Sequence, residues 1–117
     1  METQLKTEIK IAGTTFHPLP ENQYLRVNTV YEKDGVSCAE TNAVLVPEPD
    51  NPHDPEAVKV IVPLENGQPF QIGYLPRASK QKQMVKQPCQ ASITVKDFTK
   101  NNPQYSSSWI ITEIIGL

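Results

Sequence analysis

Eleven prolines are spread through the 117 residues, and their spacing limits the fold of this chain more than any other feature. Proline lacks the backbone N–H that a helix interior needs, and its ring clashes with the preceding turn. The prolines stand at positions 18, 20, 47, 49, 52, 55, 63, 69, 76, 88 and 103. Since they interrupt almost every stretch long enough for a helix, the chain is predicted to be mostly β, with stiff loops.

Length and composition indicate the number of domains and the cellular compartment. A chain of 117 residues, 38% of them hydrophobic, suffices for one compact core, so we expect a single domain over residues 1–117. Met1–Lys10 alternates charged and apolar residues and has no signal-peptide core, and no apolar run has membrane-spanning length. Cys38 and Cys89 are too few for a disulfide framework. These features predict a cytoplasmic protein with no membrane partner.

Alternating apolar and polar residues predict six or seven short strands. We expect one helix, over Arg77–Lys86 after Pro76, and turns at Asp34-Gly35 and Asn66-Gly67. Such a set of elements favours a small barrel. The expected strands are 8–13, 24–31, 43–46, 57–62, 70–75, 90–98 and 107–115.

The C-terminal strand carries bulky apolar side chains on both faces, including Trp109, Ile111 and Ile114. A strand of this kind is either central in its sheet or pairs with another copy of the chain. The sequence leaves both arrangements open, and the second would make a homodimer.

Charge is divided unevenly along the chain. The net charge of −2, taken alone, argues against a partner as anionic as DNA. However, residues 1–76 hold five basic and eleven acidic residues, whereas residues 77–100 hold six basic residues and one acidic residue. The basic segment is interpreted either as a patch that holds a few phosphates or as a solvated helix face.

Two motifs carry the functional hypothesis. The first is the proline-bounded loop Asn51-Pro52-His53-Asp54 before an apolar strand, and the second is Ile72-Gly73-Tyr74-Leu75-Pro76, which leads into Arg77. Together they resemble the HIRAN domain, and Ala12–Phe16 is similar to the first strand and aromatic residue of that family. The resemblance covers about residues 8–98, and the strand 107–115 is expected to complete the sheet. It implies a small OB-like or SH3-like barrel.

The resemblance also implies a function. Family members fused to Swi/Snf-type ATPases bind the 3′ end of single-stranded DNA. The expectation is therefore binding of single-stranded nucleic acid, specifically the 3′-hydroxyl end of single-stranded DNA, in DNA repair or in the processing of stalled or damaged DNA. The matched residues include no ATPase, so only the binding module is implied, and no catalytic residue, metal or cofactor is expected.

Eight residues are expected to bind the nucleic acid. The carboxylate of Asp54 accepts hydrogen bonds only and therefore suits a terminal hydroxyl, with Asn51 beside it. Aromatic rings stack on a base of any sequence, and a guanidinium or hydroxyl can hold phosphates. Phe16 and His53 are expected to sandwich the terminal base between their rings. The full set is Asn51 and Asp54 at the terminal hydroxyl, Phe16 and His53 at the base, Tyr74 and Arg77 on phosphate, Lys80 extending that contact, and Thr15, where some relatives have arginine.

Each assignment has a structural alternative. Asp54 is also typical of a loop staple, by which we mean a side chain that hydrogen-bonds the backbone of its own loop and so fixes the loop's shape. Phe16 would equally suit a core position, Tyr74 a barrel rim, and His53 a surface loop without a role. Gly73 is expected to allow a close approach of two backbones.

Three other functions remain open. A zinc site could draw on the four zinc-capable side chains of the chain, although their spacing fits no zinc motif: His17, Cys38, His53 and Cys89. A phosphodiester hydrolase could use a Mg²⁺ cluster made by Glu48, Asp50, Asp54 and Glu56. A protein-interaction module could use the apolar C-terminal strand and the basic helix.

Overall fold

The computed structural model describes residues 4–16, 18–100, 103, 106 and 108–117. The chain is mostly β, as predicted. Among these residues, no helix is long and apolar enough to cross a membrane. The elements are β1 (Gln4–Lys10), η1 (Thr14–Phe16), β2 (Thr29–Lys33), β3 (Val36–Pro47), β4 (Val58–Pro63), β5 (Pro69–Tyr74), η2 (Gln81–Met84), β6 (Cys89–Lys96) and β7 (Ser108–Ile115).

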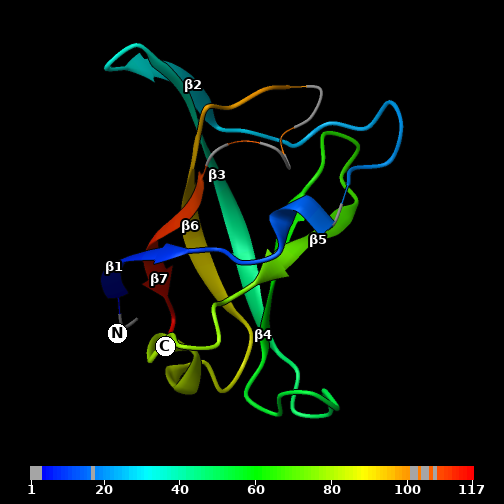
Figure 1. Cartoon of the computed structure of the whole chain (residues 1–117), viewed down its shortest axis with the longest axis vertical. Helices are drawn as coiled ribbons and strands as arrows, with labels where there is room; N and C mark the ends of the chain where they lie inside the picture. Colours follow the sequence, from blue (N-terminus) through cyan, green and yellow to red (C-terminus); the bar gives the residue numbers. More distant parts are fainter. Residues whose placement is uncertain (1–3, 17, 101–102, 104–105, 107) are drawn as a thin grey trace.

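All seven strands belong to one antiparallel sheet with the order β1-β7-β6-β3-β4-β5, and β2 pairs with β3 as a side branch (Figure 1). The strand β3 has twelve residues and is the longest. Its first half pairs with β2 and its last four residues pair with β4, while β6 runs along its opposite edge. β3 therefore holds the two halves of the sheet together.

The sheet curls until its two ends meet at one point. The backbone N–H of Ala12 donates to the carbonyl of Tyr74 at 2.9 Å, and the N–H of Tyr74 donates to the carbonyl of Ala12 at 3.0 Å. Gly73 makes this approach feasible, since a Cβ atom there would lie 2.3 Å from the Ala12 carbonyl oxygen. The small barrel is therefore confirmed in outline, but its edges join at this bridge instead of closing along whole strands.

Alternate residues of the strands fill the core. In β4, Val58, Val60 and Val62 are buried, and their neighbours are half-buried on the outer face, as a half-buried strand requires. Trp109 of β7 is 1% exposed, and its indole Nε1–H donates to the carbonyl of Pro103 at 3.0 Å. This bond satisfies the polar atom of the largest buried side chain.

Four predicted strands agree with the structure to within about two residues: those at 57–62, 70–75, 90–98 and 107–115. The predicted turns at Asp34-Gly35 and Asn66-Gly67 are also confirmed, since each connects two paired strands and its glycine has a positive φ. β7 lies between β1 and β6, so the central position is the observed one and both of its backbone edges are paired.

Three strand predictions had wrong limits. The strand expected at 43–46 extends back to Val36, because Ala39 and Thr41 are buried although their small or polar side chains give a weak apolar signal. The region 24–31 becomes a strand only from Thr29, because Leu25 makes a single bridge to Leu64. The first strand begins at residue 4 and ends at residue 10, before the turn that carries η1.

The predicted helix Arg77–Lys86 is wrong. The chain turns after Pro76 and forms only a four-residue 3-10 turn, η2. A ten-residue helix is marginal unless it buries an apolar face, and here Met84 is half exposed while Val85 enters the core. The residue of this segment that turns inward beside Val85 is a lysine, Lys82, which is only 8% exposed.

Candidate nucleic-acid interface

The loop between β3 and β4, residues 48–57, is held by its own polar side chains. The Asn51 side-chain oxygen accepts the backbone N–H groups of His53 at 2.9 Å and Asp54 at 3.0 Å. Its amide nitrogen donates to a carboxylate oxygen of Glu48 at 3.3 Å. Asp54 Oδ1 accepts the backbone N–H of Glu56 at 2.9 Å. The structural alternative for Asp54, a loop staple, is thus present, and these bonds fix the backbone at His53, whose side chain is exposed.

Three polar contacts join this loop to the segment 76–86. Lys82 Nζ lies 2.8 Å from Asp54 Oδ2, and Arg77 Nη2 donates to the backbone carbonyl of His53 at 3.1 Å. A longer contact of 3.5 Å runs from Gln83 Nε2 to Glu56 Oε2. Residues that are more than twenty positions apart in the sequence therefore form one polar surface, which we call the loop site and define as His53, Asp54, Arg77 and Lys82.

Asp54 is held in its charged form. The hydrogen bond from Lys82, followed by the backbone N–H of Glu56, lowers the pKa of the Asp54 carboxyl below its ordinary value of 3.8. The Asp54 side chain is 21% exposed, so solvent and ligands reach it. A carboxylate has about four acceptor positions, and these two donors occupy two of them. The geometry leaves acceptor capacity for a hydroxyl donor.

Phe16 lies on the other side of the sheet junction. Its side chain is 83% exposed, which excludes the core position that the sequence left open. Its backbone N–H donates to the carbonyl of Gly13 at 3.1 Å, and the bridge from Ala12 to Tyr74 places this turn beside the end of β5. Thr15, in the same turn, is also exposed, whereas Tyr74 is half-buried.

Seven of the eight predicted residues thus fall into two groups. Asn51, His53, Asp54 and Arg77 are in contact through hydrogen bonds, whereas Thr15, Phe16 and Tyr74 gather where the sheet ends meet. In Figure 1, η1 lies beside β5, while the loop after β3 lies at the lower end of the molecule. Lys80 is exposed, just before η2. Along the chain, Leu75 and Pro76 connect Tyr74 of one group to Arg77 of the other. A base held between Phe16 and His53 remains a prediction.

The basic segment does not form a single patch. Lys82 is paired with Asp54, and the Lys100 ammonium lies 5.0 Å from the centre of the Tyr24 ring. Lys96 ends β6, whereas Lys86 precedes the start of that strand, so these two lie at opposite ends of it. Fewer basic side chains therefore lie near the loop 48–57 than the six basic residues of segment 77–100 suggested.

Neither metal arrangement is assembled in the part of the chain that the structure describes. No group of three or more His, Cys, Asp or Glu residues in that part could hold a metal ion. Cys89 pairs with Leu45 of β3, seven residues from Cys38, so the two cysteines are about 23 Å apart. Among the four acids of the hydrolase alternative, Glu48 lies 3.9 Å from Lys59 and Asp54 is paired with Lys82. His17 lies outside the described residues.

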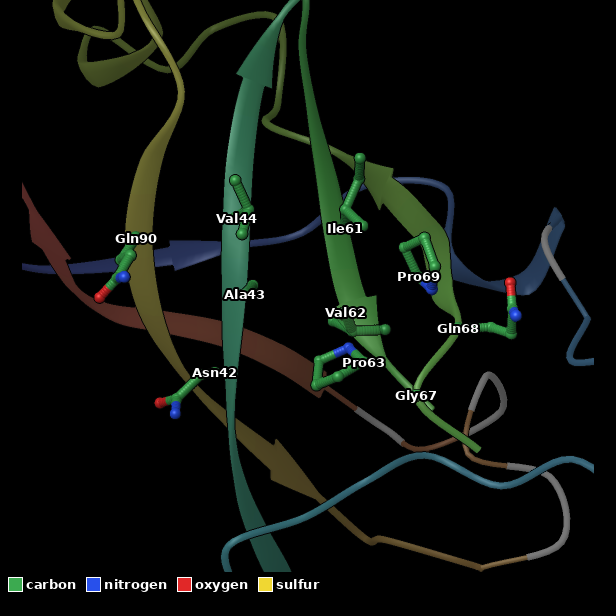
Figure 2. A pocket seen from close by; sticks show the side chains of 10 residues that line it. All are labelled: Asn42, Ala43, Val44, Ile61, Val62, Pro63, Gly67, Gln68, Pro69 and Gln90. Atoms are coloured by element: carbon green, nitrogen blue, oxygen red, sulfur yellow. The ribbon is translucent and has the colours of Figure 1, made fainter. Parts of the chain in front are cut away.

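Two hollows lie near these elements. One, of about 200 Å³, is bounded by the loop 48–57 and η2, and Lys82 and Pro55 line it. The other, of about 290 Å³, is a mostly apolar groove on the outer face of β3, β4 and β5 (Figure 2). Figure 2 shows Val44, which is 40% exposed, between Gln90 and Ile61 on the neighbouring strands. This outer groove contains none of the eight predicted residues.

Lys82 is the member of the loop site that sequence reasoning missed. A lysine in a segment of six basic residues was expected either to hold a phosphate or to lie on a solvated helix face, and no local pattern distinguishes Lys82 from Lys80 or Lys86. Its partner lies 28 positions away, so only the folded chain identifies it.

The family model described as HIRAN domain matches residues 5–112 of the 117 residues. No curated protein and no solved structure matches the chain.

Proposed function

Because the chain belongs to the HIRAN domain family, we propose that it binds the 3′-hydroxyl end of single-stranded DNA at the loop site. HIRAN domains are generally DNA-binding domains. The observation that best supports the proposal is the contact of Arg77 with His53, next to the charged Asp54. A cation, an exposed ring and an anionic acceptor then lie on one surface.

Asp54 and Arg77 of the loop site each have a chemical task in this proposal. Asp54 accepts the terminal hydroxyl, and it disfavours a terminal phosphate because that group brings negative charge against the carboxylate. Arg77 has five N–H donors, and its bond to His53 is the one hydrogen bond that it makes within the described residues. Its remaining donors are suited to a phosphate of the same strand.

Aromatic stacking supplies affinity without sequence preference. The exposed ring of Phe16 is suited to carry a base near the sheet junction, and the ring of His53 is suited to carry one at the loop. Tyr74 lies at the junction itself, where its hydroxyl is proposed to contact a phosphate. The strand would then run from the loop site past Arg77 towards the turn that holds Phe16.

Fluorescence polarisation with two matched oligonucleotides tests this function. The proposal requires that an oligonucleotide with a free 3′ hydroxyl binds more tightly than the same sequence with a 3′ phosphate. In Asp54→Ala this preference should vanish, and Asp54→Asn controls for the loss of the loop bonds because its side chain keeps an acceptor oxygen. Equal binding of both ends by the wild-type chain would remove the end-recognition role.

We also propose that the chain binds without catalysing a reaction and that it acts in DNA repair or in the processing of stalled or damaged DNA. Incubation of a labelled oligonucleotide with Mg²⁺ or Mn²⁺ tests the first part. Intact oligonucleotide is the expected result, and a product that disappears in Asp54→Ala would favour a hydrolase instead.

A protein-interaction module is the second candidate. The apolar groove of about 290 Å³ on the outer face of β3, β4 and β5 favours it, since exposed apolar surface often marks a contact with another protein. If no oligonucleotide binds at low salt, this candidate takes first place. Light scattering and pull-down experiments then test it.

A further inference from the structure

Lys82 is buried, which is unusual for a lysine side chain. Lysine is almost never fully buried unless it is paired, and Lys80 and Lys86 on either side are exposed. The Lys82 side chain is 8% exposed and its ammonium lies 2.8 Å from Asp54 Oδ2. The burial of Lys82 is therefore explained by Asp54.

The backbone of Lys82 is anchored independently of that pair. Its carbonyl accepts the N–H of Val85, and Val85 is buried in the core. The Lys82 backbone is therefore held in place by the packing of the core. The ammonium at the end of its side chain in turn holds the carboxylate of Asp54 through their hydrogen bond.

Two donors then fix the orientation of this carboxylate. Glu56 N–H binds Oδ1 and Lys82 Nζ binds Oδ2, so the group can neither rotate nor swing without losing a bond. Recognition of a hydroxyl needs the free acceptor positions to point in one direction, because hydrogen bonds weaken steeply away from linear geometry.

We propose that Lys82 is a positioning residue that aims the Asp54 carboxylate at the terminal hydroxyl and so sets the preference for a 3′-hydroxyl end. The inference rests on the proposed function and adds a residue to it. Lys82 does not touch the DNA in this scheme, and its effect reaches the ligand through Asp54 alone.

The test is Lys82→Met, which removes the ammonium and keeps most of the stem. With the two matched oligonucleotides, the affinity for the 3′-hydroxyl end should fall at least fivefold more than the affinity for the 3′-phosphate end. Lys86→Met is the matched control, since it removes the same charge from an exposed lysine four positions away, and its ratio of affinities should equal that of the wild type. Lys82→Arg should restore part of the preference because a guanidinium can also donate to the carboxylate.

Other outcomes overturn the inference. If both affinities fall by the same factor in Lys82→Met, the lysine only supports the loop, and if the phosphate end loses more, its role is charge neutralisation. Far-UV circular dichroism checks that the variant folds, and Lys82→Ala, which also removes the donor to Asp54, replaces it if it does not. The same ratio test then applies to the alanine variant.

A second measurement separates positioning from general support. The groups that face the Asp54 carboxylate are Lys82, Arg77 and the N–H of Glu56. Carbon-13 NMR titration of Asp54 should show its pKa rising towards 3.8 in Lys82→Met and staying at the wild-type value in Lys86→Met. An unchanged pKa in Lys82→Met would contradict the pairing on which the inference depends.

The two proposals fail in different ways. A wild-type chain that binds both oligonucleotides equally overturns the proposed end recognition, and this inference with it, before any variant is measured. A wild-type preference that persists unchanged in Lys82→Met overturns the inference alone.

Discussion

Arg77 donates a hydrogen bond from Nη2 to the backbone carbonyl of His53 at 3.1 Å, although 24 positions separate the two residues. The bond places a permanent cation beside the loop that carries Asp54. It also connects the two sequence motifs, one on the loop after β3 and the other at the end of β5. This contact gives the first prediction.

Arg77→Ala should weaken binding of both oligonucleotide ends by about tenfold, which corresponds to about 1.4 kcal/mol. The reason is that a phosphate contact is independent of the chemistry of the 3′ end. Polarisation titrations at several salt concentrations should also show the slope of log affinity against log salt reduced by about one. A change in the ratio between the two ends would show that Arg77 contacts the terminus itself.

Phe16→Ala should lower affinity by about 1–3 kcal/mol, the range for one stacked base. Because the Phe16 side chain is 83% exposed, the free energy of unfolding should change by less than about 0.5 kcal/mol. Urea unfolding and polarisation on the same sample check both values. Val30→Ala, at an apolar side chain of β2 that is 54% exposed, is the control and should bind normally. Equal affinity of Phe16→Ala and the wild type would remove Phe16 from the interface.

Gly73→Ala should destabilise the chain by about 3 kcal/mol or more, because the new methyl group would lie 2.3 Å from the Ala12 carbonyl oxygen. Gly67→Ala is the matched control: its Cβ would meet open space, and only its positive φ of 88° opposes the change, at about 1 kcal/mol. Urea unfolding curves measure both. Similar losses of unfolding free energy in the two variants would show that the backbone at the junction between Ala12 and Tyr74 shifts readily to accommodate the methyl group.

Stability should fall in acid through Asp54. The pKa of its carboxyl is lowered in the folded chain, first by the hydrogen bond from Lys82, so the unfolded chain binds the proton more tightly. The stabilisation is complete above the ordinary value of 3.8 and is lost as the pH falls through the lower folded value. Urea midpoints at pH 6 and at about pH 2.5 should therefore differ less in Asp54→Asn than in the wild type. An identical difference in both would show that other carboxyls dominate acid unfolding.

The sequence predicted the fold where its local signals were strong. Val58, Val60 and Val62 alternate with half-buried neighbours, and Asn66-Gly67 specifies a tight turn, so this hairpin was located correctly. The start of β3 was missed because Ala39 and Thr41 are buried by long-range pairing with β6 and carry little apolar surface of their own. The periodicity of a strand is visible only where its buried side chains are large.

The candidate site was predictable only as far as the motifs reach. The loop, the element before Arg77 and Arg77 itself contain five of the eight expected residues, and the bond from Arg77 to His53 joins the two motifs. The pair of Lys82 with Asp54 was hidden because Arg77–Lys86 was predicted as a solvated helix, whereas the chain turns and buries that lysine. A contact between residues 28 positions apart leaves no trace in local composition.

The junction between Ala12 and Tyr74 is made by backbone atoms alone. The spacing between the turn that carries Phe16 and the segment that starts at Arg77 is thus independent of surface side chains. Homologous chains can exchange the residues on either side while the frame between them stays constant, provided that position 73 remains glycine. Ligand preference in such a fold is free to diverge faster than its architecture.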